Sequence, residues 1–194
     1  MPKPKPTSSA SSQVSYRSLR VLLVDDNQNM RIILNEMLRA VGVTYVFEAA
    51  NGAEGFQLMH EHKFDVVITD FVMQPLNGIE FVRLIRTDPR SPDPEIPVVM
   101  ITGHSTISRV SAARDAGVWL AHVSTDFVFD GQAQRPYDEF DAPRPLGSYA
   151  RSKRAGELLL AEVGAAHALV RLQGLYGRGG RNFVSTLLQR LREG

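Results

Sequence analysis

The sequence predicts an α/β protein organised as a doubly wound parallel sheet. Short runs rich in β-branched and aromatic residues alternate along the chain with segments whose apolar residues recur at helical spacing. Glycine or proline stands at several of the boundaries between them. Two of the strand-like runs end on aspartate, at the edge where open parallel sheets place their functional groups. This alternation is typical of a parallel sheet with helices on both faces.

A tail precedes four strand–helix units. Residues 1–18 are rich in proline, serine and lysine and are expected to be disordered, because they contain little that could be buried. Strands are expected at residues 19–24, 45–49, 64–70 and 98–102. Helices are expected at residues 29–41, 53–62, 79–86 and 105–116, and the last of them stops at Gly117.

The first helix carries a stripe of six apolar side chains at helical spacing. A stripe of this kind is expected to face the core, with its methionines acting as packing residues rather than as metal ligands. The six residues are Met30, Ile33, Leu34, Met37, Leu38 and Val41.

Three aspartates are expected to converge at the carboxyl edge of the sheet. Asp25 and Asp26 end the first strand, and Asp70 ends the third. Three neighbouring carboxylates repel one another, so the site needs a cation, and oxygen ligands with free positions suit Mg²⁺. Asp70 would then be a nucleophile toward a phosphoryl donor. The alternative is that all three are ordinary helix caps and loop acids.

The segments VLLVDDNQNMRIILNEML, FDVVITD and VVMITGHST resemble the receiver domains of two-component response regulators. The resemblance covers residues 19–118 and implies a flavodoxin-like fold that accepts phosphate from a histidine kinase or a phosphotransfer protein. By position it implies metal binding by Asp25 and Asp26, phosphorylation of Asp70, a metal-binding backbone carbonyl at Val72 and a switch hydroxyl at Thr102. The proline that the family places four residues after the acceptor falls one position later, at residue 75.

The chain carries a different chemistry after Gly117. Tyr149 and Lys153 form a Y-x-x-x-K pair, which lies on one face of a helix. The lysine can lower the pKa of the phenol, and a hydroxyl at Ser124 or Thr125 can bind the same substrate oxygen. This arrangement is suited to proton transfer during carbonyl reduction.

The segments VSTDFVFDG, SYARSKRAGE, LVRLQGLYG and GRNFV resemble the extended short-chain dehydrogenase/reductase family, and within it the dTDP-4-dehydrorhamnose reductases. By position, Thr125, Tyr149 and Lys153 match that family's catalytic triad. The family's glycine-rich cofactor turn is missing after the first strand, which ends VDDNQNM, and GRGG at 177–180 follows the wrong strand. We therefore expect no cofactor-binding residues and an inactive triad. Enzymatic activity is the less favoured of the two alternatives.

The chain thus reads as a receiver-like portion, residues 19–118, joined to a reductase-like portion, residues 119–194. Both families are doubly wound parallel sheets, so the second portion is expected to complete or extend the same sheet in the manner of a Rossmann fold. Strands are expected at 120–125 and 167–173, with covering helices at 148–163 and 183–192. The alternative is a receiver-like lobe with a loosely docked tail.

His122 falls at the join and has two interpretations. Aligning WLAH with the receiver family's aromatic-Leu-Ala-Lys pattern puts His122 at a lysine that contacts the phosphoryl group, as a second switch position. It also matches a buried strand histidine of the reductase family. The two interpretations carry equal weight.

Bulk composition limits the partners. The chain has 194 residues, a formal net charge of +1 and no cysteine, which argues against nucleic acid or a membrane as a partner and fits a cytoplasmic protein. The first functional hypothesis is a phosphoacceptor receiver module that uses Mg²⁺. The alternatives are an NAD(P)-dependent sugar-nucleotide reductase fragment and a folded chimera with neither activity.

Overall fold

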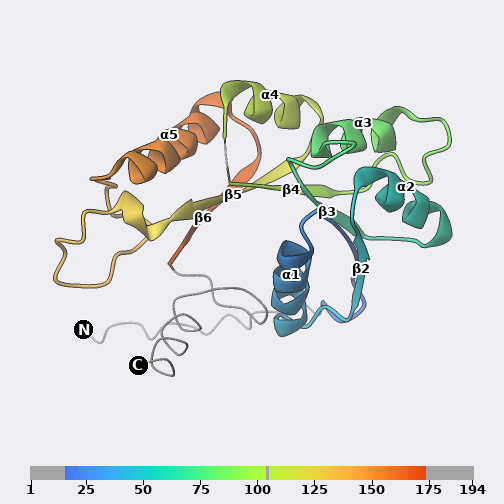
Figure 1. The fold of residues 1–194 in the computed structure, drawn as a ribbon, viewed down its shortest axis with the longest axis horizontal. Coiled ribbons are helices and arrows are strands. Elements are labelled where there is room, and N and C mark those ends of the chain that lie inside the picture. The colour runs from blue at the N-terminus through green and yellow to red at the C-terminus, as the bar shows by residue number, and fades with distance from the viewer. Residues whose placement is uncertain (1–15, 104, 174–194) are drawn as a thin grey trace, which may run out of the picture.

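The computed structural model describes residues 16–103 and 105–173, which form one parallel six-stranded sheet (Figure 1). The strand order is β2-β1-β3-β4-β5-β6. The strands are β1 (Arg20–Val24), β2 (Tyr45–Ala49), β3 (Val66–Asp70), β4 (Val98–Thr102), β5 (Trp119–Thr125) and β6 (His167–Leu172). β5 pairs with β4 on one side and with β6 on the other, so the sheet continues without a break across the join. The expectation of one continuous sheet is therefore confirmed.

The helices are distributed unequally over the two faces of the sheet. They are α1 (Gln28–Ala40), α2 (Gly52–Glu61), α3 (Gly78–Thr87), α4 (Ile107–Asp115) and α5 (Ser148–Val163), with a short 3₁₀ helix, η1 (Asp126–Val128). Figure 1 shows α2 to α5 along one face and α1 alone on the other. The strand order explains this distribution. The right-handed crossovers from β2 to β3, β4, β5 and β6 in turn all run in one direction along the sheet, so their helices lie on the same face. The crossover from β1 to β2 runs in the opposite direction, so α1 lies on the other face.

The turn between β3 and α3 holds Asp70 at the edge of the sheet. Asn77 caps α3 by accepting a hydrogen bond from the Glu80 backbone N–H, and the Glu80 carboxylate accepts one from the Asn77 N–H. Gly78 must be glycine here, because a Cβ atom at this position would collide with the Asp70 carbonyl oxygen. Asn77 and Gly78 together therefore allow the start of α3 to lie close to the end of β3.

The main core lies between the sheet and helices α2 to α5. Val67, Met100 and Leu120 lie on this side of the sheet and are almost fully buried. The expectation that the α1 methionines fill the core is wrong. No residue of α1 is fully buried, and Met30 and Met37 are 37% and 51% exposed. Their helix lies on the sparsely covered face, so part of its apolar stripe has nothing described to pack against.

Several expected features lie outside the described residues. These are most of the N-terminal tail, the GRGG segment and the helix at 183–192. Within residues 16–103 and 105–173, no helix combines the length and the hydrophobicity that a membrane span requires.

Candidate functional site

Two of the three predicted acids are withdrawn from solvent. Asp25 is 5% exposed and Asp70 is partly buried, whereas Asp26 is exposed. The carboxylate of Asp25 accepts a hydrogen bond from the Asn27 N–H at 2.8 Å. The carboxylate of Asp70 accepts one from the Val72 N–H at 3.0 Å. Backbone donors in the two loops thus orient both carboxylates at the same edge of the sheet.

The acids interact electrostatically. The pKa of Asp25 is raised to about 6, mainly by burial and in part by the nearby charges of Asp70 and Asp26, against the lowering effects of the Asn27 hydrogen bond and the Arg31 charge. Burial also raises the pKa of Asp70, and the charge of Asp26 acts in the same direction. The three aspartates that the sequence grouped are therefore near enough to interact, and their mutual repulsion is the property that a bound cation would relieve.

The donor set fits a hard divalent cation in its chemistry. Carboxylate oxygens and a backbone carbonyl, here from Val72, are the ligands that Mg²⁺ prefers. The side chains are not drawn together into a closed cage. Across residues 16–103 and 105–173, no group of three or more histidine, aspartate or glutamate side chains is arranged to hold a metal ion. Asp26 is the exposed member of the three.

Two arginines near the acids were missed by the sequence reasoning. The Arg31 guanidinium donates to the backbone carbonyl of Asp25 at 2.7 Å. Arg109 of α4 stacks over the Phe71 ring, 4.9 Å from its centre, and its charge lowers the pKa of Asp70 against the effect of burial. Arg31 lies within the receiver-like segment VLLVDDNQNMRIILNEML, but neither it nor Arg109 was assigned a role, and only their positions in the first turns of α1 and α4 could have pointed to the site.

The two predicted switch positions lie side by side in the sheet. Thr102 and His122 are both buried and are paired in the register of β4 and β5. The Nδ1 atom of His122 lies 2.9 Å from the Ser105 hydroxyl oxygen. The ring also packs so closely on Gly156 of α5 that an added Cβ atom would be 3.3 Å away. These contacts resemble those of a packed strand histidine, and the switch role of His122 stays a prediction.

The three reductase-like residues line one pocket. Thr125, Tyr149 and Lys153 surround a cavity of about 430 Å³ beyond the ends of β5 and β6. The Thr125 hydroxyl donates to the Asp126 carboxylate at 3.1 Å and accepts from the Phe127 N–H at 3.3 Å, so it caps η1. The Tyr149 side chain is 58% exposed. The sequence grouping of these three residues agrees with their placement.

Lys153 is engaged with the backbone of the sheet. It is 9% exposed, and its Nζ atom donates to the carbonyl of Gly103 at 2.6 Å and to that of Val123 at 2.7 Å. Burial lowers its pKa, and the charge of Glu157 acts in the opposite direction. Lys153 therefore connects α5 to the residue that follows β4 and to a residue within β5.

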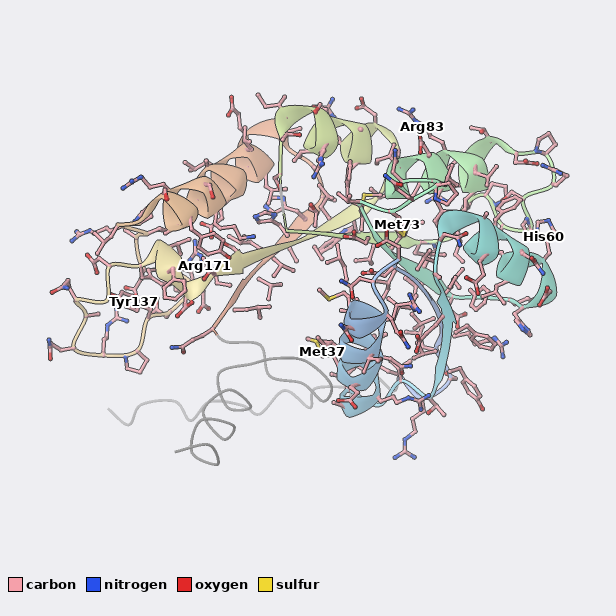
Figure 2. All side chains as sticks on the ribbon, viewed as in Figure 1. Met37, His60, Met73, Arg83, Tyr137 and Arg171 are labelled. Atoms are coloured by element: carbon pink, nitrogen blue, oxygen red, sulfur yellow. The ribbon has the colours of Figure 1, made fainter. Side chains whose placement is uncertain are left out.

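A buried carboxylate below this pocket was also missed. The side chain of Glu157 is 1% exposed and accepts hydrogen bonds from Ser124 at 2.6 Å, Arg154 at 2.8 Å and Arg171 at 2.9 and 3.0 Å. Figure 2 shows Arg171 on β6 beneath α5. Burial alone would raise the pKa of Glu157, but these hydrogen bonds and the Arg171 charge lower it overall. The available signal was the position of Glu157, one helical turn after Lys153.

Comparison with known proteins gives two overlapping family matches. The response regulator receiver domain matches residues 21–121, and the RmlD substrate binding domain matches residues 98–194. Each match covers half of the chain or slightly more. Residues 98–121, which contain β4, α4 and the start of β5, lie in both.

Individual relatives fall into the same two groups. The chemotaxis protein CheY of Pseudomonas aeruginosa is 34% identical over 100 residues, which are 52% of this chain and 79% of CheY. The dTDP-4-dehydrorhamnose reductase of Escherichia coli is 34% identical over 145 residues, 67% of this chain but only 48% of that enzyme. The fold is also similar to a Bacillus anthracis dTDP-4-dehydrorhamnose reductase structure, with a TM-score of 0.53 and 23% identity over 91% of this chain and 60% of that one.

Proposed function

The chain belongs to the response regulator receiver domain family over residues 21–121 and to the RmlD substrate binding domain family over residues 98–194, and on this basis we propose that it is a phosphoacceptor module of a two-component phosphorelay. Asp70 is the proposed acceptor. The observation that carries this proposal is the electrostatic coupling of Asp25, Asp26 and Asp70 at one edge of the sheet.

The proposed reaction is a phosphoryl transfer to the Asp70 carboxylate. A carboxylate oxygen attacks phosphorus, the bond from phosphorus to the donor breaks, and the donor group leaves with the electron pair. The Val72 N–H, which already binds one carboxylate oxygen, holds Asp70 in place during the attack. Asp25, Asp26, Asp70 and the Val72 carbonyl would hold Mg²⁺, which when bound would neutralise charge on the transferred group. A histidine kinase or a phosphotransfer protein is the proposed donor.

A second candidate is a reductase fragment, favoured by the shared pocket of Thr125, Tyr149 and Lys153. Two observations weigh against it. Lys153 already donates to two backbone carbonyls, and the turn after β1 carries Asp25 and Asp26 where pyrophosphate would need uncharged glycines. Saturable NADPH binding in a fluorescence titration, lost in Lys153→Ala, would favour the reductase over the receiver function.

The proposal is tested by incubating the chain with acetyl phosphate or phosphoramidate and measuring its intact mass. We expect one added phosphoryl group, formed only with Mg²⁺ and absent in Asp70→Asn. The matched control is Asp115→Asn, which removes an aspartate that is exposed on α4 and forms only a surface ion pair. Equal labelling of wild type and Asp70→Asn would contradict the assignment.

A further inference from the structure

The chain between the end of β4 and the first turn of α4 contacts both halves of the molecule. It includes the predicted switch residue Thr102 and runs as far as Arg109. We term residues 101–103 and 105–109 the bridging segment. Helix α4 lies between α3 and α5 along one face of the sheet (Figure 1), so this segment has the acidic site on one side and the reductase-like helix α5 on the other.

On one side, the bridging segment contacts the residue that follows Asp70. The Phe71 N–H donates to the Ile101 carbonyl at 3.1 Å, and the Arg109 guanidinium lies over the Phe71 ring, 4.9 Å from its centre. The Arg109 charge also acts on Asp70 itself, because burial raises the pKa of that carboxyl and the arginine opposes the rise. The position of the bridging segment therefore determines how close a positive charge lies to the proposed acceptor.

On the other side, side chains of the reductase-like portion hold the bridging segment. The Nζ atom of Lys153, on α5, donates to the Gly103 carbonyl at 2.6 Å. The same ammonium group donates to the Val123 carbonyl of β5 at 2.7 Å, so it ties Gly103 to the neighbouring strand. The Ser105 hydroxyl oxygen lies 2.9 Å from the Nδ1 atom of His122, also on β5.

The contact between Lys153 and Gly103 is well suited to holding this segment. A hydrogen bond from a charged donor is about twice as strong as a neutral one. Lys153 is 9% exposed, so water competes little for its ammonium group. Loss of this side chain would remove a donor from the carbonyl that directly follows β4, and the first turn of α4 would be held less tightly.

We propose that Lys153 is a positioning residue for phosphoryl transfer at Asp70, and that it acts by holding the bridging segment, and with it Arg109, beside the acceptor. The inference rests on the proposed function of Asp70. A positive charge that is already in place stabilises the negative charge of the phosphoryl group during transfer without any rearrangement. A lysine of the reductase-like pocket would in this way serve the receiver-like site.

This role is separate from metal binding. The residues proposed to hold Mg²⁺ lie at or after the ends of β1 and β3, outside the bridging segment. A change at Lys153 should therefore alter the maximal rate of phosphorylation and leave the Mg²⁺ concentration that gives half of that rate unchanged.

The rate of labelling by acetyl phosphate, followed by intact mass at saturating Mg²⁺, tests the proposal. Lys153→Met and Arg109→Gln should each slow labelling several-fold. The double variant should be little slower than either single one, because both changes weaken the same positive charge at the acceptor. Arg83→Gln removes an exposed arginine from α3 and should label at the wild-type rate. Wild-type labelling of Arg109→Gln, or fully additive losses in the double variant, would contradict the proposal.

Glu157→Gln distinguishes positioning from a general loosening of α5. Glu157 is buried one helical turn after Lys153, and its partners Ser124, Arg154 and Arg171 belong to β5, α5 and β6. This variant should lose stability and still label at the wild-type rate. Equal slowing of Glu157→Gln and Lys153→Met would overturn the proposal.

Hydrogen exchange tests the holding of the bridging segment without any phosphoryl donor. In the first turn of α4, the N–H groups of Arg109 and Val110 donate to the hydroxyl and the carbonyl of Thr106, at 3.4 and 3.0 Å. Lys153→Met should exchange both protons several-fold faster than wild type and Glu157→Gln, and unchanged exchange would contradict the proposal. Absence of labelling in wild type contradicts the proposed function of Asp70, whereas labelling that Lys153→Met leaves unchanged contradicts the role of Lys153 alone.

Discussion

Asp25 is the residue whose environment most affects the acidic site. Its carboxylate is buried near two other acids, and its pKa is raised to about 6 from the ordinary aspartate value of 3.8. A carboxyl group with a raised pKa favours the folded state while it is protonated and loses that contribution as pH rises through the folded pKa. The folded protein therefore loses stability from this residue between about pH 4 and pH 6. The ionised state of Asp25, which the proposed Mg²⁺ binding requires, is therefore the one that lowers the stability of the folded protein.

The first prediction follows from this loss of stability as pH rises. Asp25→Asn should increase the free energy of unfolding at pH 8 without Mg²⁺ by about 1–3 kcal/mol, because a two-unit shift corresponds to about 3 kcal/mol. At pH 4 the gain should vanish, since Asp25 of the folded wild type is then protonated. Urea denaturation at the two pH values measures this. A gain of the same size at both would show that Asp25 carries no ionisation penalty.

The helix position of Lys153 could be predicted from the sequence, but its contacts could not. The Y-x-x-x-K spacing correctly predicted a shared helix face, but the lysine's acceptors lie 50 and 30 residues earlier in the chain. No local pattern encodes those partners. Gly103 follows β4 and Val123 lies within β5, and only the folded sheet brings both carbonyls to α5. The sequence matched Lys153 to a position in a catalytic triad that was expected to be inactive, and the structure adds the two backbone contacts of its ammonium group.

The second prediction tests that contact. Lys153→Met should lower the free energy of unfolding by about 2–4 kcal/mol, because hydrogen bonds from a charged donor are worth about 1.5–3 kcal/mol each. Lys63→Met, at an exposed lysine, should change it by less than about 0.5 kcal/mol. Both values come from urea denaturation without any nucleotide. If Lys153→Met is as stable as Lys63→Met, Lys153 does not fasten α5 to the sheet.

At the scale of elements, Glu157 joins α5 to the last two strands. Its carboxylate accepts from Ser124 of β5, Arg171 of β6 and Arg154 of its own helix. Its pKa is lowered overall, so its contribution to stability is present above pH 4.5 and is lost as pH falls through the folded pKa. The network is thus the main polar connection that keeps β6 at the edge of the sheet under α5.

Removing this charge is the third prediction. Glu157→Gln should cost about 3–5 kcal/mol at pH 7, because it leaves the Arg171 guanidinium beside a neutral group in a buried site. The loss should shrink toward pH 3. Glu162→Gln changes an exposed residue of the same helix and should be nearly neutral. Thermal unfolding at the two pH values distinguishes the variants, and a pH-independent loss would contradict a role for the ionised carboxylate.

The secondary structure was predictable because each element follows a local rule. β2, β4 and α5 have the expected limits, the other described α-helices and strands differ by no more than two residues at either end, and the short helix η1 was not predicted. α4 starts two residues late because Thr106 acts as its N-cap. The exposure of Met37 was not predictable in this way. Apolar spacing indicates which side of α1 is apolar, but not whether another element covers it.

At the scale of the whole molecule, the two families share one structural unit. Residues 98–121 match both, and they form β4, α4 and the start of β5 in a sheet that continues in both directions. A join inside a shared unit preserves strand pairing and helix packing, which explains how the halves form one sheet. The sequence predicted this continuity because both families that it resembles have parallel α/β sheets. It did not predict that crossovers would place α2 to α5 all on one face, since that depends on strand order.

We propose above all that Asp70 of this chain accepts a phosphoryl group, as receiver domains do. Borohydride reduction after treatment with acetyl phosphate and Mg²⁺ tests it most directly, because it converts an aspartyl phosphate into homoserine at the modified position. Peptide mass spectrometry should then find homoserine at position 70 and aspartate at positions 25 and 26. Homoserine at another aspartate, or an unmodified Asp70 in a folded and Mg²⁺-saturated chain, would contradict the claim.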